Sequence, residues 1–191
     1  MRSVWLILLA LLSCASVDPA LAEKRVALVI GMSRYQQVPQ LSNPARDADA
    51  MAAVFKQAGF DEVRNERDIG ISELRRAIRE FSETSRDADI SVVYFAGHGI
   101  EVDRVNYLVP VDAKLSSDFD IEDETVSLDR VLKALEPVRR LKLVILDACR
   151  ENPFANRMKR SVASRAVGRG LARVDRPRPT RSSLSLRGPA R

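Results

Sequence analysis

The sequence predicts an α/β fold in which a parallel sheet of about four strands carries helices on both faces. Short, continuously apolar runs alternate along the chain with longer segments of helical periodicity, which is the pattern of such a sheet. Two of these runs, 92–97 and 143–148, are each followed directly by a reactive side chain, His98 and Cys149. In open parallel sheets, ligands bind at the carboxyl ends of the strands.

The first strand is expected over residues 24–31, because 26–30 form an uninterrupted apolar run. The helix that follows is expected over 45–59 and ends at a glycine. Asn43 is the expected cap of this helix, and Pro44 falls in its first turn.

A weaker strand, at the edge of the sheet, is expected over 60–66. Ser72 is expected to cap the next helix, which has Glu73 in its first turn and ends near Arg86. Its apolar residues recur at helical spacing at Leu74, Ile78 and Phe81.

The third strand is expected over 90–95, followed by a turn at 96–99 and a small excursion or hairpin over 100–111. The next loop is crowded with acidic residues, namely Asp118, Asp120, Glu122, Asp123 and Glu124. Ser127 is the expected cap of the last helix, and 141–146 form the fourth strand. The apolar stripe of that helix consists of Leu128, Val131, Leu132 and Leu135.

Length and composition fit a single globular domain with a sizeable core. The chain has 191 residues, of which 46% are hydrophobic and 30% charged. This composition argues against collagen, a coiled coil and a multispan membrane protein.

Residues 1–22 predict a secretory signal peptide and therefore an exported protein, either periplasmic or secreted. Arg2 precedes an apolar stretch over 4–12, and Ala20-Leu21-Ala22 forms a small-x-small cleavage signal. An uncleaved amphipathic or anchoring helix is the alternative, although the apolar run is too short to span a bilayer. In a second alternative, Cys14 is lipidated and tethers the protein to a membrane.

Charge divides the remaining chain into an acidic domain over 23–155 and a basic tail over 156–191. The last 37 residues hold eleven Lys and Arg side chains against one acidic residue, Asp175. A basic arm can bind nucleic acid or anionic lipid, but this one has no aromatic residue to stack on bases. We therefore expect a solvated, disordered tail and no nucleic-acid partner.

His98 and Cys149 are the candidate catalytic pair. The chain contains one histidine and two cysteines, and Cys14 is lost if the signal peptide is removed. A thiol must become a thiolate to attack a carbonyl, and a neighbouring imidazole is the usual base. The alternative is that Cys149 is a buried, inert side chain.

Two blocks resemble the signature motifs of the caspase-like superfamily, of the peptidase C14 type, on its bacterial metacaspase-like side: Tyr94-Phe95-Ala96-Gly97-His98-Gly99 and Asp147-Ala148-Cys149-Arg150-Glu151-Asn152-Pro153-Phe154. Segments 27–31 and 43–48 also resemble that family, so the likeness covers about 24–155. The distance in sequence from His98 to Cys149 is likewise that of caspases.

This resemblance implies a cysteine endopeptidase that acts on protein or peptide substrates. Cys149 would be the nucleophile and His98 the general acid and base. The backbone amides of Gly99 and Cys149 would form the oxyanion hole, where a glycine after the histidine permits close approach.

The resemblance also implies cleavage after Arg or Lys. Caspases have glutamine where this chain has Asp147, whereas metacaspases have an acidic residue there and a second pocket acid that matches Asp47. A carboxylate pairs with a guanidinium through two parallel hydrogen bonds, which supports the same specificity. Two alternatives stay open: Asp47 complements a helix dipole, or Asp147 pairs with Arg150.

No metal or cofactor is required by this chemistry. Several metacaspases are activated by calcium, and the acidic segment 118–124 raises that alternative here. The segment lacks the spacing of an EF-hand, and a solvated charged loop is the simpler interpretation.

The resemblance breaks after the fourth strand. A caspase-like fold has six strands, and this chain contains only the large-subunit part, because 180–191 are polar and basic where an apolar strand is expected. A truncation, or a frameshift near 177–180, would explain the difference. The strand left at the edge of the sheet would then bind a strand-pairing partner or form an oligomer.

Three functions therefore remain open. The chain is an active endopeptidase, alone or with a partner that supplies the missing strands. Alternatively it is a catalytically inactive caspase-like module that binds proteins, or a truncated remnant without a stable function.

Overall fold

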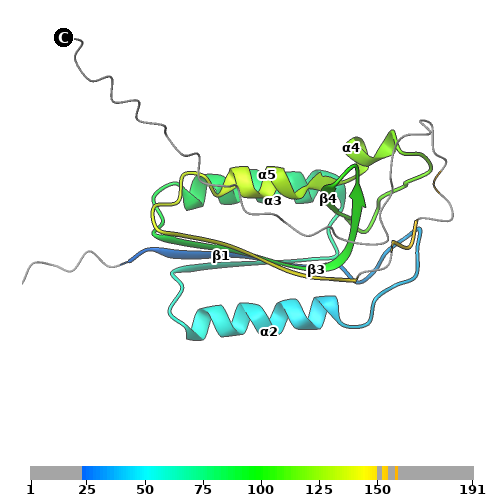
Figure 1. Cartoon of the computed structure of the whole chain (residues 1–191). Coiled ribbons are helices and arrows are strands. Elements are labelled where there is room, and N and C mark those ends of the chain that lie inside the picture. Colours follow the sequence, from blue (N-terminus) through cyan, green and yellow to red (C-terminus); the bar gives the residue numbers. More distant parts are fainter. Residues whose placement is uncertain (1–22, 150–151, 155–157, 159–191) are drawn as a thin grey trace, which may run out of the picture.

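The computed structural model describes residues 23–149, 152–154 and 158. Four parallel strands lie in the order β2, β1, β3, β6 (Figure 1). Their bounds are β1 Arg25–Gly31, β2 Glu62–Arg67, β3 Ile90–Val102 and β6 Leu141–Cys149. The predicted parallel α/β sheet, with β2 at its edge, is thereby confirmed.

Helices cover both faces of this sheet, as predicted. Helix α2 (Pro44–Gln57) packs on one face, and α3 (Ile71–Ser85) and α5 (Leu128–Ala134) lie on the other (Figure 1). Because side chains alternate along a strand, β1 contributes to two cores. Ala27 and Val29 join the cluster under α2, and Leu28 and Ile30 join the larger cluster under α3 and α5.

Strand β3 continues through the region where the sequence predicts a turn, so the prediction of a turn at 96–99 is wrong. On one side, the amide of Met32 donates a hydrogen bond to the Ala96 carbonyl (2.9 Å). On the other side, the register with β6 continues as far as the pair His98 and Cys149. The hydrogen bond from Met32 and the pairing with β6 therefore hold residues 96–98 extended.

The hairpin expected after the histidine is confirmed. β3 bends away from the parallel sheet and pairs antiparallel with β4 (Val105–Leu108) (Figure 1). β4 in turn pairs with the two-residue strand β5 (Val126–Ser127).

The first turn of α2 departs from the predicted cap. Asn43 occupies the N-cap position but has helical dihedrals (φ −104°, ψ −36°), and its side chain makes no capping hydrogen bond. Instead, the Ser33 hydroxyl accepts a hydrogen bond from the Ala45 amide (3.0 Å). A side chain distant in sequence thus satisfies the helix end, which no local pattern reveals.

The start of α3 also differs from the prediction that Ser72 caps it. The helix begins at Ile71, with Gly70 as N-cap in an extended conformation. The Ile71 amide donates to the Asp112 carboxylate (2.9 Å), and the Gly70 amide donates to Glu73 (3.3 Å). Two carboxylates therefore take the place of the predicted serine hydroxyl.

The acidic segment is partly helical, whereas the sequence predicts a loop. Asp120–Glu124 form the short helix α4, and the Asp120 carboxylate accepts hydrogen bonds from the amides of Ser116 and Ser117. In α5 the predicted cap is confirmed, because the Ser127 hydroxyl accepts from the Arg130 amide (3.3 Å).

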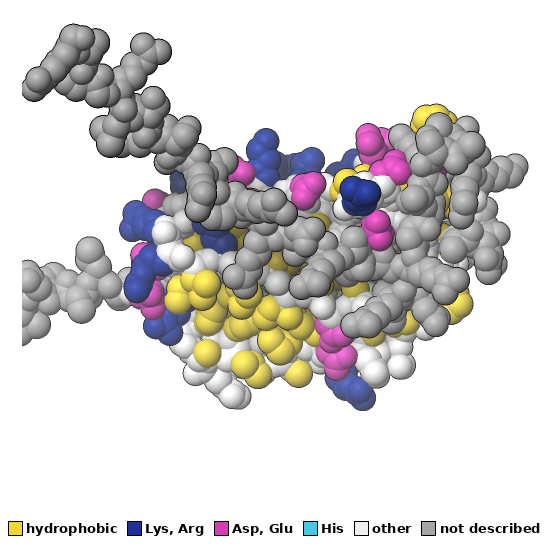
Figure 2. Space-filling model, viewed as in Figure 1, with side chains coloured by type: hydrophobic (Ala, Val, Ile, Leu, Met, Phe, Trp, Pro, Cys, Tyr) yellow, Lys and Arg dark blue, Asp and Glu magenta, His cyan; other side chains and the backbone are white. Residues whose placement is uncertain are grey.

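Strand β6 has a neighbouring strand on only one edge within the described part of the chain. On the sheet face shared with α2, Leu141 is 48% exposed and Leu143 is 40% exposed. Figure 2 shows an apolar patch on this side of the molecule. After the strand, Phe154 and Met158 are buried in the larger cluster under α3 and α5.

The predicted signal peptide (1–22), Cys14 and nearly all of the predicted tail (156–191) lie outside the described residues. Among the helices that are described, none has the length and hydrophobicity needed to cross a membrane.

Candidate active site

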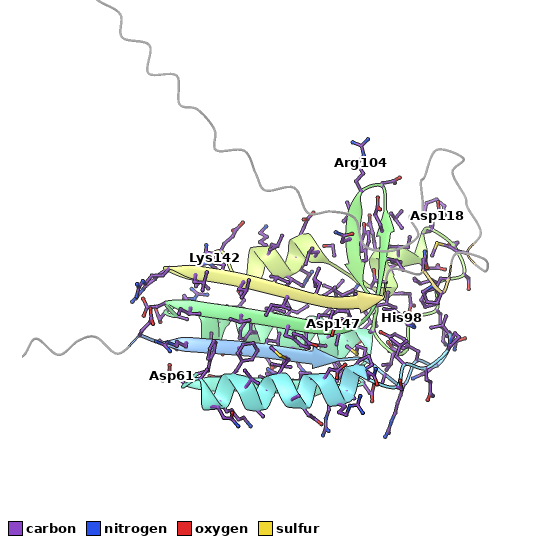
Figure 3. All side chains as sticks on the ribbon, turned by 60° about the horizontal axis from the view of Figure 1, so that its bottom comes forward. Asp61, His98, Arg104, Asp118, Lys142 and Asp147 are labelled. Carbon is purple, nitrogen blue, oxygen red and sulfur yellow. The ribbon has the colours of Figure 1, made fainter. Side chains whose placement is uncertain are left out.

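Strand register places the predicted catalytic residues opposite each other. His98 and Cys149 are the last partners in the parallel pairing of β3 with β6. Figure 3 shows His98 and Asp147 at this end of the sheet, whereas Asp61 and Lys142 lie at the other end. The sheet therefore brings together the two residues that are 51 positions apart in the sequence.

The imidazole of His98 is almost completely buried, with 5% of the residue exposed. Its Nε2 lies 3.4 Å from the Pro39 carbonyl oxygen, and Nδ1 has no hydrogen-bond partner within the described part of the chain. The tautomer that donates from Nε2 to this carbonyl leaves the lone pair on Nδ1. His98 can thus accept a proton at Nδ1.

Burial lowers the pKa of His98 below its ordinary value, because desolvation disfavours the imidazolium. The hydrogen bond to Pro39 opposes this effect in part. The ring is therefore neutral at neutral pH, which is the state that a general base requires.

Tyr35 supports His98, and the sequence reasoning missed it. Its hydroxyl accepts a hydrogen bond from the His98 amide (2.7 Å) and donates one to the Val109 carbonyl (3.2 Å). The centroids of the Tyr35 and His98 rings lie 4.4 Å apart, and the ring planes are inclined at 50°. A Cβ on Gly97 would lie 2.6 Å from the Tyr35 hydroxyl, so this contact requires glycine.

Asp68 holds the loop that carries Tyr35 and Pro39. Its carboxylate accepts hydrogen bonds from the amides of Ser33 (2.6 Å) and Arg34 (2.8 Å). Asp68 itself has a positive φ of 51°, which is an uncommon conformation for a residue other than glycine. The loop is therefore anchored next to the residues that position His98.

Gly99, the predicted oxyanion-hole residue, pairs with Leu108 of β4. The Val109 amide donates to the His98 carbonyl (3.1 Å), which makes Gly99 and Leu108 a non-hydrogen-bonded pair. The amide of Gly99 consequently points away from β4, toward the side of β3 on which β6 lies.

Both predicted pocket acids line one cavity of about 240 Å³ beside the candidate pair. Asp47 comes from the first turn of α2, and Asp147 comes from the end of β6. The lining is Leu41, Ser42, Asn43, Pro44, Asp47, Ala96, Gly97, Asp147 and Ala148. The alternative pairing of Asp147 with Arg150 involves a residue outside the described part, whereas the first-turn position of Asp47 also suits a helix-dipole role.

Tyr94 contacts one of the lining residues, because its hydroxyl donates to Oδ2 of Asp147 (3.1 Å). Burial raises the pKa of Tyr94, and the negative charges of Asp147 and Asp47 raise it further. The phenol is therefore neutral and acts as a donor. Tyr94 belongs to a motif identified in the sequence, but no role follows from the motif alone.

Within residues 23–149, 152–154 and 158, no group of three or more His, Cys, Asp or Glu side chains is arranged to hold a metal ion. Calcium activation through segment 118–124 stays a prediction.

Comparisons with known proteins identify the family of this chain. A family model described as the caspase domain, peptidase C14, matches residues 24–184. The human mucosa-associated lymphoid tissue lymphoma translocation protein 1 is 31% identical over 137 residues, which are 71% of this chain and 16% of that protein. The mouse homologue is 30% identical over 132 residues, 69% of this chain and 15% of its own length.

The chain thus spans about one sixth of the length of these curated relatives. Among solved structures, protein GSU0716 from Geobacter sulfurreducens matches with a TM-score of 0.50 and 17% identity, over 66% of this chain and 50% of that one. This likeness concerns the fold alone. The family match covers most of the sequence, including both strands that carry the candidate pair, and the chain belongs to the caspase-domain family of peptidases, peptidase C14.

Proposed function

We propose that this protein is a cysteine endopeptidase of the metacaspase-like type, with Cys149 as nucleophile and His98 as general acid and base. The observation that carries the proposal is the register that pairs His98 with Cys149 at the carboxyl edge of the sheet. The buried, neutral imidazole with an available Nδ1 supports it.

In the proposed reaction, the Cys149 thiol gives its proton to His98, and the thiolate attacks the carbonyl carbon of the scissile peptide bond. The C–N bond then breaks as His98 returns the proton to the leaving amine, and a thioester remains on Cys149. Water, deprotonated by His98, hydrolyses this thioester. The amides of Gly99 and Cys149 are the proposed donors to the oxyanion.

The proposed substrates are polypeptides with Arg or Lys before the scissile bond. Two carboxylates, Asp47 and Asp147, share the cavity beside the catalytic pair, so it suits a cationic side chain. The apolar parts of Leu41 and Pro44 can contact the methylene groups of that side chain.

The proposal is tested with fluorogenic peptides that end in Arg, Lys or Asp, with and without calcium. We expect the purified protein to cut the Arg and Lys peptides and to leave the Asp peptide intact. The matched Cys149→Ala variant must be inactive. Absence of cleavage in every condition, or cleavage that survives in Cys149→Ala, would refute the proposal.

A protein-interaction module is the second candidate function, and the exposed edge of β6 favours it. Leu141 and Leu143 are solvent-exposed on a strand with a single neighbour in the described part of the chain. We propose that a second copy pairs with this edge. Sedimentation velocity is expected to show a dimer that Leu143→Lys converts to a monomer, and a monomeric wild type contradicts this.

We also propose that the protein acts after export, with residues 1–22 removed. N-terminal sequencing of the protein recovered from the exporting cell is expected to begin at Glu23. An N-terminus at a lipid-modified Cys14 would identify the membrane-tethered form instead, and an intact Met1 would argue against export.

A further inference from the structure

We propose that Tyr94 determines specificity at the cavity between Asp47 and Asp147: its hydroxyl fixes the Asp147 carboxylate so that the cavity selects arginine over lysine. The inference rests on the proposed function, because it concerns the same cavity. Neither the family match nor the sequence motifs assign a role to this hydroxyl.

The sheet positions the two side chains. Ala96 is the register partner of Asp147 in the pairing of β3 with β6, and Tyr94 precedes Ala96 by two residues on the same face. Tyr94 is 4% exposed, so its ring is held by the core under α2. Asp147, by contrast, is exposed at the end of its strand.

The small side chain of Ala96 lets the phenol reach the carboxylate. The hydroxyl lies 3.1 Å from Oδ2 of Asp147. A buried ring thus anchors an otherwise exposed side chain at one of its two oxygens. Among the residues that the structure describes, Tyr94 alone donates to this carboxylate, which leaves Oδ1 and the other lone pair of Oδ2 for a ligand.

The phenol acts only as a donor in this arrangement. It keeps its proton because burial and the two neighbouring carboxylates disfavour the phenolate. Loss of the hydroxyl therefore removes one hydrogen bond to Asp147 and leaves the charge of the cavity unchanged.

Guanidinium and ammonium groups differ in what they require of the carboxylate. A guanidinium forms two parallel hydrogen bonds and needs the carboxylate plane in a defined orientation. An ammonium is a compact charge with three rotatable donors, so it tolerates a carboxylate that turns. Fixing Asp147 consequently favours arginine and has little effect on lysine.

The test is Tyr94→Phe, assayed on two peptides that differ only in Arg or Lys before the scissile bond. We expect kcat/KM for the Arg peptide to fall about tenfold because KM rises. The kcat for the Arg peptide and kcat/KM for the Lys peptide are expected to change by no more than about twofold. The matched control, Tyr107→Phe, removes a hydroxyl from β4 and is expected to leave the ratio unchanged.

A double variant separates specificity from a merely structural role. In an Asp147→Asn background, Tyr94→Phe is expected to have no further effect on the Arg to Lys ratio. The inference is wrong if Tyr94→Phe in the otherwise wild-type protein lowers kcat/KM equally for both peptides. It is also wrong if this variant leaves the ratio of the two kcat/KM values unchanged.

Binding measurements distinguish this inference from the proposed function. Calorimetry with Cys149→Ala is expected to show tighter binding of the Arg peptide than of the Lys peptide, and adding Tyr94→Phe should remove that preference. If the wild type cuts neither peptide but this preference is present and depends on Tyr94, only the peptidase proposal fails. Binding without a preference for Arg overturns the inference in either case.

Discussion

His98 is held at its backbone, its ring face and its Nε2 atom. Tyr35 accepts the backbone hydrogen bond and contacts the ring, and the Pro39 carbonyl faces Nε2. All of these contacts come from one loop, 32–43. The remaining ring nitrogen, Nδ1, is left for proton transfer, so the proposed chemistry depends on a residue whose orientation is fixed before substrate binds.

The lowered pKa of His98 gives a measurable pH dependence. Because the chain has one histidine, a single set of imidazole NMR signals reports it. In Cys149→Ala, which removes coupling to the thiol, we expect a titration midpoint below 6.5, the ordinary value. The same protein in urea should titrate near that value, and a folded-state midpoint above it would contradict the buried site.

The same shift links pH to stability. Between the folded-state pKa of His98 and 6.5, the unfolded chain binds more protons than the folded chain. The neutral ring's contribution to the free energy of unfolding is therefore fully present above 6.5 and is lost as the pH falls toward the folded-state value. Urea titrations at a series of pH values check this sign, and the contribution should disappear in His98→Gln.

The two cavity acids, Asp47 and Asp147, are expected to determine how tightly an Arg peptide binds. Asp147→Asn and Asp47→Asn are each expected to raise KM for an Arg peptide by about tenfold or more, because each removes a charge that faces the guanidinium. Asp61→Asn, at the opposite end of the sheet, is the control and should leave KM unchanged (Figure 3). If Asp47→Asn alters only stability, then Asp47 complements the dipole of α2 instead.

Removal of the Tyr35 hydroxyl tests the support of His98. Tyr35→Phe keeps the ring but leaves the buried His98 amide without its acceptor, so we expect a loss of about 1–3 kcal/mol in the free energy of unfolding. Urea unfolding monitored by circular dichroism measures it. A loss below about 0.5 kcal/mol would mean that the hydrogen bond is replaced or unimportant.

The ends of the predicted strands indicated His98 and Cys149, and the family resemblance indicated Asp47 and Asp147 as pocket acids. They did not predict Tyr35, Pro39 or Tyr94 as site residues. Tyr35 and Pro39 lie in a loop without periodicity, and they contact His98 across about 60 residues of sequence. The role of Tyr94 depends on the register between β3 and β6, which no local pattern encodes.

At the scale of elements, the apolar runs predicted the strands and the helical periodicity predicted the long helices. The ends of the elements were less predictable. Strand β3 extends past the expected turn because its pairing with β6 continues to His98. Both misassigned caps are replaced by side chains from other segments, Ser33 and Asp112. Element ends are set by tertiary contacts that become visible only when the sheet is assembled.

The start of α2 provides a prediction at this scale. Ser33→Ala removes the hydroxyl that accepts from the Ala45 amide and is expected to cost about 1 kcal/mol in the free energy of unfolding. Asn43→Ala, which changes the residue in the formal N-cap position, is expected to cost less, because its side chain makes no capping hydrogen bond. Chemical denaturation of both variants measures the two losses in the free energy of unfolding. A larger loss for Asn43→Ala than for Ser33→Ala would identify Asn43 as the cap after all.

At the scale of the whole molecule, the parallel order of four strands brings α2, β3 and β6 to one edge, and each contributes to the site. The fold class followed from the sequence because alternating strands and helices leave few alternatives. The apolar composition of β6 predicts a buried strand, but its position at the edge of the described sheet leaves Leu141 and Leu143 exposed, as the resemblance to a six-stranded fold led us to expect. Activity and strand pairing are therefore questions about the same strand, β6.

Covalent labelling tests whether Cys149 is a nucleophile that acts on arginine-bearing substrates. An arginine-containing peptidyl acyloxymethyl ketone is incubated with the protein, and the product is analysed by intact and peptide mass spectrometry. We predict one label, located on Cys149, which is absent in Cys149→Ala, strongly reduced in His98→Gln and not formed by the matching aspartate probe. No label on Cys149 would show that it is not the nucleophile, and equal labelling by both probes would show that the site does not select arginine.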